Sequence, residues 1–322
     1  MRWRIPPIFL TVVLAVTVAV PQAWGDVTAK RAEAASRGAE DGTREVHRYR
    51  MAGKIRPLLL FWIGRDNVGS ARLAWEREGD ELHAIELLIG SDPARAPRQV
   101  NRWGYIREEV AGPVAVVTGL VGRTDEQSLD EAEASVEDGG AGGYLFRMLE
   151  ARVDRVRSTA TLRTINSRHD YTYHELDALE RALDGPSAKV ETKSAPRPDQ
   201  ARPGMLAALH ELVADSLMRY RRDPANVQRG ARRQLEYIYN VTVYDLTLER
   251  TRVRREARYG GRAYTNLLES EFEVHNQKTG NRESFTIVYG TEGAHTAVPV
   301  FLEYQPRWWL KVELVLDEDQ DI

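Results

Sequence analysis

The chain has 322 residues, with 45 basic and 48 acidic side chains, a formal net charge of −3 and no cysteine. This charge balance gives no indication of nucleic-acid binding. The lack of cysteine excludes disulfides, zinc thiolate sites, thiol catalysis and the lipidated cysteine of a bacterial lipoprotein. Six of the basic residues are lysine and 39 are arginine, a bias typical of a GC-rich bacterial genome. We therefore expect a bacterial protein that is stabilised by packing, and no sequence pattern indicates a cofactor.

Residues 1–25 have the pattern of a signal peptide. Two arginines precede an uncharged run over 5–20, and Ala23 and Gly25 are the small residues expected before cleavage at Asp26. This pattern predicts export to the periplasm or the exterior of a bacterium. The alternative is retention as an N-terminal anchor, because the run approaches the roughly 17–25 residues of a membrane span. We expect no transmembrane segment after cleavage.

A polar lead-in over 26–44 is expected to precede an N-terminal α+β lobe over 45–185. Alternation and apolar runs predict strands over 46–52, 56–63, 70–77, 82–89, 113–121 and 152–165. Apolar residues at helical spacing predict a helix that begins at Thr124 and another over 173–184. Between 90 and 112 the periodicity stops, so we expect an irregular segment there.

Residues 186–203 contain four prolines and read as a linker. The linker separates either two domains or two lobes that share a sheet. Beyond it, over 204–322, we expect an amphipathic helix near 204–222. The change of parity in 234–249 predicts a bulge or bend near Tyr244-Asp245.

Two further hairpins are expected, one around 278–281 and one across the corner 305–309. Consecutive hairpins with one polar face favour an α+β fold with a predominantly antiparallel, curved sheet, half-barrel or lipocalin-like, and a few amphipathic helices. In architecture this pattern resembles exported lipid-carrier and lipocalin-like proteins, in which helices lie across the opening of a curved sheet.

The segment 95–107 combines arginines with aromatic and amide side chains. Arginine binds carboxylates and phosphates, and aromatic rings stack on rings and sugars. The candidate ligand-binding residues are Arg95, Arg98, Asn101, Arg102, Trp103 and Tyr105, together with Trp308 and Trp309 at the last hairpin corner. The alternative is structural: a buried Trp103 pins a long crossover, and the tryptophan pair covers the core and a sheet edge.

A weak metal candidate lies at His169, Asp170 and His174, which could supply nitrogen and oxygen ligands. Their spacing does not place both histidines on one helical face. The alternative is a solvated helix entrance, where Asp170 acts electrostatically on the helix N-terminus.

No catalytic residue is predicted. The chain has no Gly-x-Ser-x-Gly elbow, and the segment 64–69 lacks the Gly-Lys-Ser/Thr ending of a phosphate loop. Carboxylate pairs such as Glu108-Glu109 and Glu271-Glu273 could serve glycoside hydrolysis, but nothing in the sequence sets their separation. The alternating glutamates are better explained by the solvated face of a strand.

The leading hypothesis is a non-enzymatic envelope protein that binds an amphipathic or anionic ligand, such as a lipid or glycan, or an envelope partner, between sheet and helices. One alternative is a secreted hydrolase that uses acidic residues with His169 or His174. A third hypothesis is a scaffold that assembles other envelope proteins.

Overall fold

The structure is a computed structural model that describes residues 43–55, 63–79, 81–112, 114–122, 143–225, 227, 232–307 and 310–318. The predicted signal peptide, the lead-in up to residue 42, the predicted helix at Thr124 and the Trp308-Trp309 pair lie outside the described residues.

Fourteen described strands form one antiparallel sheet. The first eight are β1 (Thr43–Ile55), β2 (Ile63–Glu78), β3 (Glu81–Ser91), β4 (Trp103–Glu109), β5 (Ala115–Gly122), β6 (Tyr144–Val153), β7 (Arg157–Ser167) and β8 (Lys189–Pro196). The last six are β9 (Arg233–Tyr239), β10 (Thr242–Tyr259), β11 (Arg262–Asn276), β12 (Arg282–Gly290), β13 (Pro299–Arg307) and β14 (Leu310–Leu316).

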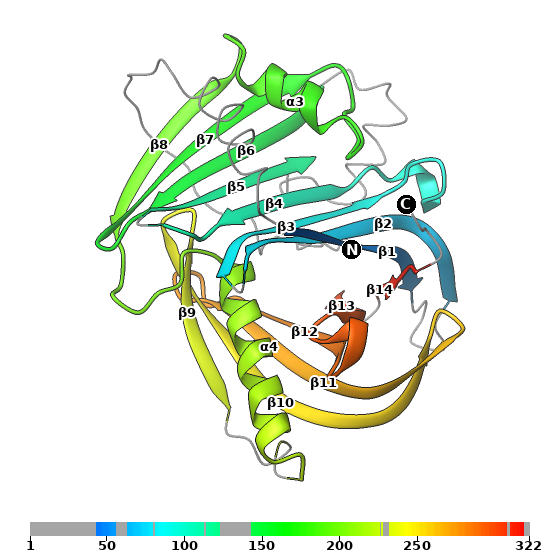
Figure 1. Cartoon of the computed structure of the whole chain (residues 1–322). Helices are drawn as coiled ribbons and strands as arrows, with labels where there is room; N and C mark the ends of the chain where they lie inside the picture. Colours follow the sequence, from blue (N-terminus) through cyan, green and yellow to red (C-terminus); the bar gives the residue numbers. More distant parts are fainter. Residues whose placement is uncertain are drawn as a thin grey trace, which may run out of the picture.

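The strand order shows how the two halves of the chain join. Strands β1 to β8 follow one another as a meander, and β14 back to β9 continue the sheet on the other side of β1. The residues before and after the predicted boundary therefore share one sheet, whose edges are β8 and β9. Figure 1 shows that this sheet curves strongly, so the prediction of a curved, mostly antiparallel sheet with a few helices is confirmed.

Two α-helices are described, α3 (Leu176–Leu183) and α4 (Met205–Arg222), beside the short 3₁₀ turns η2 (Pro97–Gln99) and η4 (Gly293–His295). Tyr105 of β4 packs in the same hydrophobic cluster as α3, whereas its neighbour Ile106 packs with α4. Because adjacent side chains of a strand point to opposite sides, the helices cover opposite faces. We call these the α3 face and the α4 face. Figure 1 shows the sheet curving around α4.

Helix α4 matches the amphipathic helix predicted near 204–222. Its residues Leu206, Leu212 and Leu217 are buried in the core cluster with strands from both halves of the sheet. The helix begins after Gly204, which supplies no capping side chain. Because the first N–H groups of a helix have no partner within it, they must find acceptors elsewhere.

Strand β8 corrects the predicted linker. Residues 189–196, which we expected to be part of a proline-rich linker, pair with β7 from Thr164 to Arg157. Only Pro196 lies within the strand, at its end, and proline is tolerated on an edge strand. Two lysines on β8 also suit an exposed edge.

Strands β4 and β6 correct the expected irregular segment and the expected strand over 152–165. The residues Trp103 to Ile106 of β4 are all buried, so no alternation marks them. The expected strand 152–165 is divided by a turn in which the Asp154 carboxylate accepts hydrogen bonds from the N–H groups of Val156 and Arg157. A short polar side chain that bonds to nearby backbone typically forms such a turn.

The predicted bend near Tyr244-Asp245 was wrong. The chain turns at Asn240 and Val241, which have φ angles of 46° and 54°, and β10 then pairs with β9 without interruption. A shift of register occurs further along β10, between Leu248 and Arg250. A valine with positive φ is unusual, and no sequence rule predicts it.

None of the helices in the described residues is both long and apolar enough to cross a membrane.

Candidate functional site

Two polar clusters lie back to back on strand β4. Arg107 and Glu108 are neighbours in sequence, so their side chains point to the α3 face and the α4 face, respectively. Glu108 pairs across the sheet with Ile85 of β3 and Val117 of β5. The two clusters differ in how their polar groups are satisfied.

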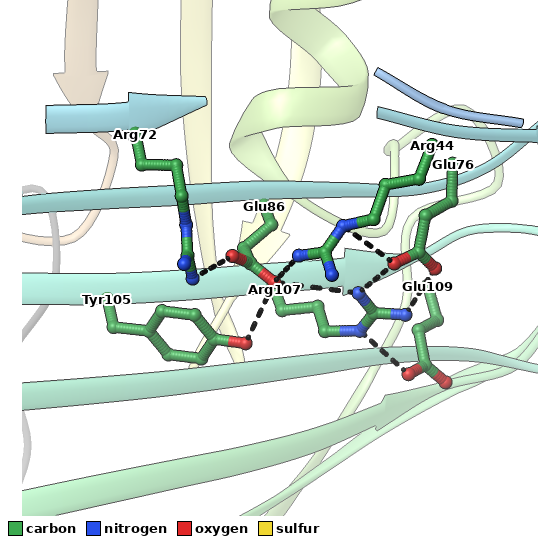
Figure 2. A network of polar contacts seen from close by, with 7 residues as sticks. All are labelled: Arg44, Arg72, Glu76, Glu86, Tyr105, Arg107 and Glu109. Carbon is green, nitrogen blue, oxygen red and sulfur yellow. Dashed lines mark hydrogen bonds and ion pairs between the residues drawn. The ribbon is translucent and has the colours of Figure 1, made fainter. Parts of the chain in front are cut away.

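On the α3 face, Arg107 is the centre of a charged network (Figure 2). Its guanidinium donates to both carboxylate oxygens of Glu76, at 2.9 and 2.6 Å, and to Glu109 at 3.1 Å. Glu86 is 5% exposed and lies 3.7 Å from Arg107. Arg72 donates to the same carboxylate at 2.6 Å.

Arg44 and Tyr105 complete this network. Arg44 donates to Glu86 at 3.3 Å and lies 3.6 Å from Glu76, and the Tyr105 hydroxyl is 3.5 Å from Glu86. The hydrogen bond with Arg107 holds the pKa of Glu76 below its usual range. The three arginines and three glutamates balance in charge and connect β1, β2, β3 and β4. We interpret the network as a support for strand register.

On the α4 face, Glu108 caps helix α4. Its Oε1 accepts a hydrogen bond from the Leu206 N–H, and its Oε2 accepts one from the Ala207 N–H, both at 2.8 Å. Glu108 is fully buried. A carboxylate at a helix N-terminus satisfies free N–H groups and interacts favourably with the helix dipole. A residue of β4 therefore provides the cap that Gly204 lacks.

The contact also depends on Gly204. A Cβ atom at this position would lie 2.2 Å from the Glu108 Cδ atom, so only glycine permits the carboxylate to approach the helix so closely. Burial raises the pKa of Glu108 to about 7, although the hydrogen bonds from the helix N–H groups act in the opposite direction. This carboxyl group can therefore change protonation near neutral pH.

Two tyrosines of β9 border Glu108. Tyr237 and Tyr239 are 0% and 2% exposed, and neither hydroxyl has a hydrogen-bond partner among the residues that the structure describes. Burial raises the pKa of both hydroxyls, and the nearby Tyr244 and Glu108 raise it further. A Cβ atom on Gly119 of β5 would lie 2.7 Å from the Tyr239 hydroxyl. Tyr239 therefore reaches from one edge strand to the opposite half of the sheet.

Unpaired buried hydroxyls are energetically costly, at about 1–3 kcal/mol each. Most buried polar groups in proteins therefore have partners, and exceptions require an explanation. Here the two hydroxyls lie beside a carboxyl group that titrates near neutral pH. We define the Glu108 site as Glu108, Tyr237, Tyr239 and the N–H groups of Leu206 and Ala207, and take it as the candidate functional site.

Sequence reasoning missed the Glu108 site. Glu108 was considered only with Glu109, and those two side chains lie on opposite faces of β4. The available signal was the start of α4, where an amphipathic helix begins at Gly204 with no Ser, Thr, Asp or Asn to cap it. Such a helix requires a distant acceptor, but the sequence does not say which residue provides it.

Three of the predicted ligand-binding residues have structural partners. Trp103 is 2% exposed, and its Nε1 donates to the Tyr171 carbonyl oxygen at 2.8 Å. Asn101 is buried and donates to the same oxygen at 3.0 Å. Tyr105 is buried beside Glu86. These contacts favour the alternative in which Trp103 pins the crossover.

The three arginine candidates lie on the segment between β3 and β4. Arg95 is exposed and lies 3.3 Å from Asp92, and Arg98 belongs to the turn η2. The Arg102 N–H donates to the Ser91 hydroxyl at 2.8 Å. The structure thus brings Asn101 and Trp103 together at one carbonyl oxygen.

The weak metal candidate lies at the start of α3. His169 pairs with Glu175 at 2.8 Å, and the Thr172 N–H donates to the same glutamate at 2.9 Å. The His174 ring packs on Tyr173. Across the described residues, no group of three or more His, Asp or Glu side chains is placed to hold a metal ion. The contacts of His169 with Glu175 are those of a helix entrance.

No protein-family model, no curated protein and no solved structure matches the chain.

Proposed function

We propose that the chain is a non-enzymatic binding protein of the bacterial cell envelope, which holds an amphipathic ligand between the α4 face of its sheet and helix α4. The observation that carries this proposal is the pair of unpartnered, buried hydroxyls of Tyr237 and Tyr239 beside Glu108. A polar ligand head group would remove the cost of burying them. The signal-peptide pattern over 1–25 supports the location.

The chemistry of the Glu108 site restricts the ligand. Glu108 is an acceptor when ionised, and a tyrosine hydroxyl both donates and accepts. The head group should therefore be neutral and hydroxyl-rich or amide-like, because an anionic group would be repelled by Glu108. The arginines of the α3-face network do not favour an anionic ligand either, because each of them is paired with a carboxylate.

Apolar side chains surround the polar end of the site. Ile85, Val117 and Leu206 are buried in the core cluster next to Glu108. Such surroundings suit an acyl chain. In this proposal α4, the described helix on this face, moves to admit the ligand. The curved sheet with a helix over one face supports the carrier hypothesis that was derived from the sequence.

The proposal is tested by native mass spectrometry of mature protein purified from its own envelope. Wild type should retain a neutral amphiphile, and the variant Tyr237→Phe/Tyr239→Phe should lose it. The double variant removes no hydrogen bond within the protein, so it should fold. As a matched control, Tyr289→Phe removes a buried hydroxyl that bonds to Ser270 at 2.9 Å, and it should keep the ligand.

Two outcomes would contradict the proposal. One is a bare polypeptide in the wild-type spectrum that also fails to bind an added monoacylglycerol. The other is an equal amount of bound amphiphile in wild type and in the double variant, which would mean that the hydroxyls pair with enclosed water rather than with a ligand.

A further inference from the structure

Three polar contacts fix the first two turns of α4. Glu108 binds the helix N-terminus, as described above. His210 of α4 accepts a hydrogen bond from Arg77 of β2 at 3.3 Å. Glu211 forms a two-pronged ion pair with Arg202 of the segment before the helix. Two of these contacts, at Glu108 and His210, involve side chains whose charge depends on pH.

The contacts of Glu108 and His210 respond to protonation in opposite ways. The His210 Nε2 atom can accept a hydrogen bond from the Arg77 guanidinium only while the ring is neutral, because a protonated imidazole has no acceptor atom. Acidification would place a second cation beside Arg77. Glu108, in contrast, is enclosed without a cationic side chain acting on it, so its neutral, protonated form is cheaper to bury.

The groups that face each contact are few. Glu108 is faced by the N–H groups of α4, by Tyr237 and Tyr239 of β9, and by apolar side chains of β3 and β5. His210 is faced by Arg77 of β2 and flanked on α4 by Glu211. The charge of Glu211 is itself satisfied by Arg202.

We propose that Glu108 and His210 couple the docking of α4 to pH in opposite directions, so that the helix stays docked over the Glu108 site from mildly acid to neutral conditions. This inference concerns the regulation of the site proposed above and rests on that function for its purpose. An exported protein experiences the pH of its surroundings. A carrier outside the cytoplasm would keep its ligand through changes of pH if the helix over the site stayed docked.

The direction of each pKa shift agrees with this arrangement. Burial raises the pKa of Glu108 to about 7 from 4.5, so its contribution to docking is complete below about pH 4.5 and is lost as the pH rises to about 7. Burial, followed by the charge of Arg77, lowers the pKa of His210 from 6.5. The contribution of His210 is complete above about pH 6.5 and is lost as the pH falls through its lowered pKa.

Hydrogen–deuterium exchange of the amides of residues 205–213 tests the proposal. The opening constant of this segment is measured from pH 5 to pH 8, corrected for intrinsic exchange, in wild type, Glu108→Gln, His210→Gln and the double variant, with no ligand added. Glu108→Gln should open more as the pH falls. His210→Gln should open more as the pH rises, by up to about tenfold for each pH unit between pH 5 and pH 7.

Wild type and the double variant should each change less with pH than either single variant. Glu108→Gln will also raise the opening constant at every pH, because one amide oxygen replaces the two carboxylate oxygens that cap the helix. The test is therefore how the opening constant changes with pH, and not its absolute value. Two single variants with the wild-type slope, or with slopes of the same sign, would overturn the proposal. Because no ligand is present, such a failure leaves the ligand proposal standing, and loss of the ligand proposal leaves these slopes unaffected.

Discussion

Arg107 and Glu108 are adjacent on one strand, yet the polar groups around them are satisfied in different ways. On the α3 face, every carboxylate of the Arg107 network is paired with an arginine side chain. On the α4 face, the Glu108 carboxylate is held by backbone N–H groups, and the neighbouring hydroxyls of Tyr237 and Tyr239 have no hydrogen-bond partner among the described residues. Charges that are paired within the protein support the fold, whereas unpaired buried hydroxyls beside a carboxyl group favour a site for another molecule.

The largest effect in this comparison is expected from Glu108→Ala. The substitution leaves buried N–H groups at the start of α4 without an acceptor, so the free energy of unfolding should fall by about 3 kcal/mol. Urea denaturation measures the loss. The matched control is Glu109→Ala, since the Glu109 side chain is 50% exposed and belongs to the other face. Equal losses in the two variants would contradict the role given to Glu108.

A smaller loss is expected from Gly204→Ala. The added Cβ would overlap the Glu108 carboxylate, and overpacking of this kind costs about 2 kcal/mol. Gly53→Ala is the control, because its nearest contact to an added Cβ is an ordinary 3.6 Å from Val68. Thermal unfolding followed by circular dichroism compares the two variants. A Gly204→Ala protein as stable as Gly53→Ala would show that Glu108 does not contact the helix as described.

The smallest loss is expected on the α3 face. Arg107→Met keeps most of the side-chain volume but removes the hydrogen bonds to Glu76 and Glu109, and it should cost about 1 kcal/mol. Arg95→Met is the control, since the exposed Arg95–Asp92 pair contributes little. Urea denaturation at low and high salt should show the difference narrowing with salt. Reduced ligand retention in Arg107→Met would contradict the assignment of ligand binding to the α4 face alone.

Local patterns predicted those elements whose faces differ in polarity. The apolar stripe of α4 and the alternation of β11 and β12 were visible in the sequence and are present in the structure. Strand β4 was missed because Trp103 to Ile106 is buried on both faces, so alternation disappears. Strand β8 was hidden by prolines around it, although an edge strand tolerates them.

The candidate site was beyond prediction for a different reason. Glu108 and Leu206 are 98 residues apart, and their contact exists only because β9 and α4 fold back over β4 and β5. Trp103 attracted attention because it is aromatic and near arginines, yet its indole nitrogen is satisfied by a backbone carbonyl oxygen. Residue type indicated which groups could bind, but only the partners of each group in the fold show which ones remain unpaired.

The central claim is that Tyr237 and Tyr239 are kept for a ligand, and the unfolding temperature tests it most directly. It should be measured for wild type and Tyr237→Phe/Tyr239→Phe, each stripped of lipid and each with saturating monoacylglycerol. Stripped of lipid, the variant should be at least as stable as wild type, because it no longer buries unpaired hydroxyls. Added monoacylglycerol should raise the unfolding temperature of wild type clearly more than that of the variant. An equal rise in both proteins, or none in wild type, would contradict the account.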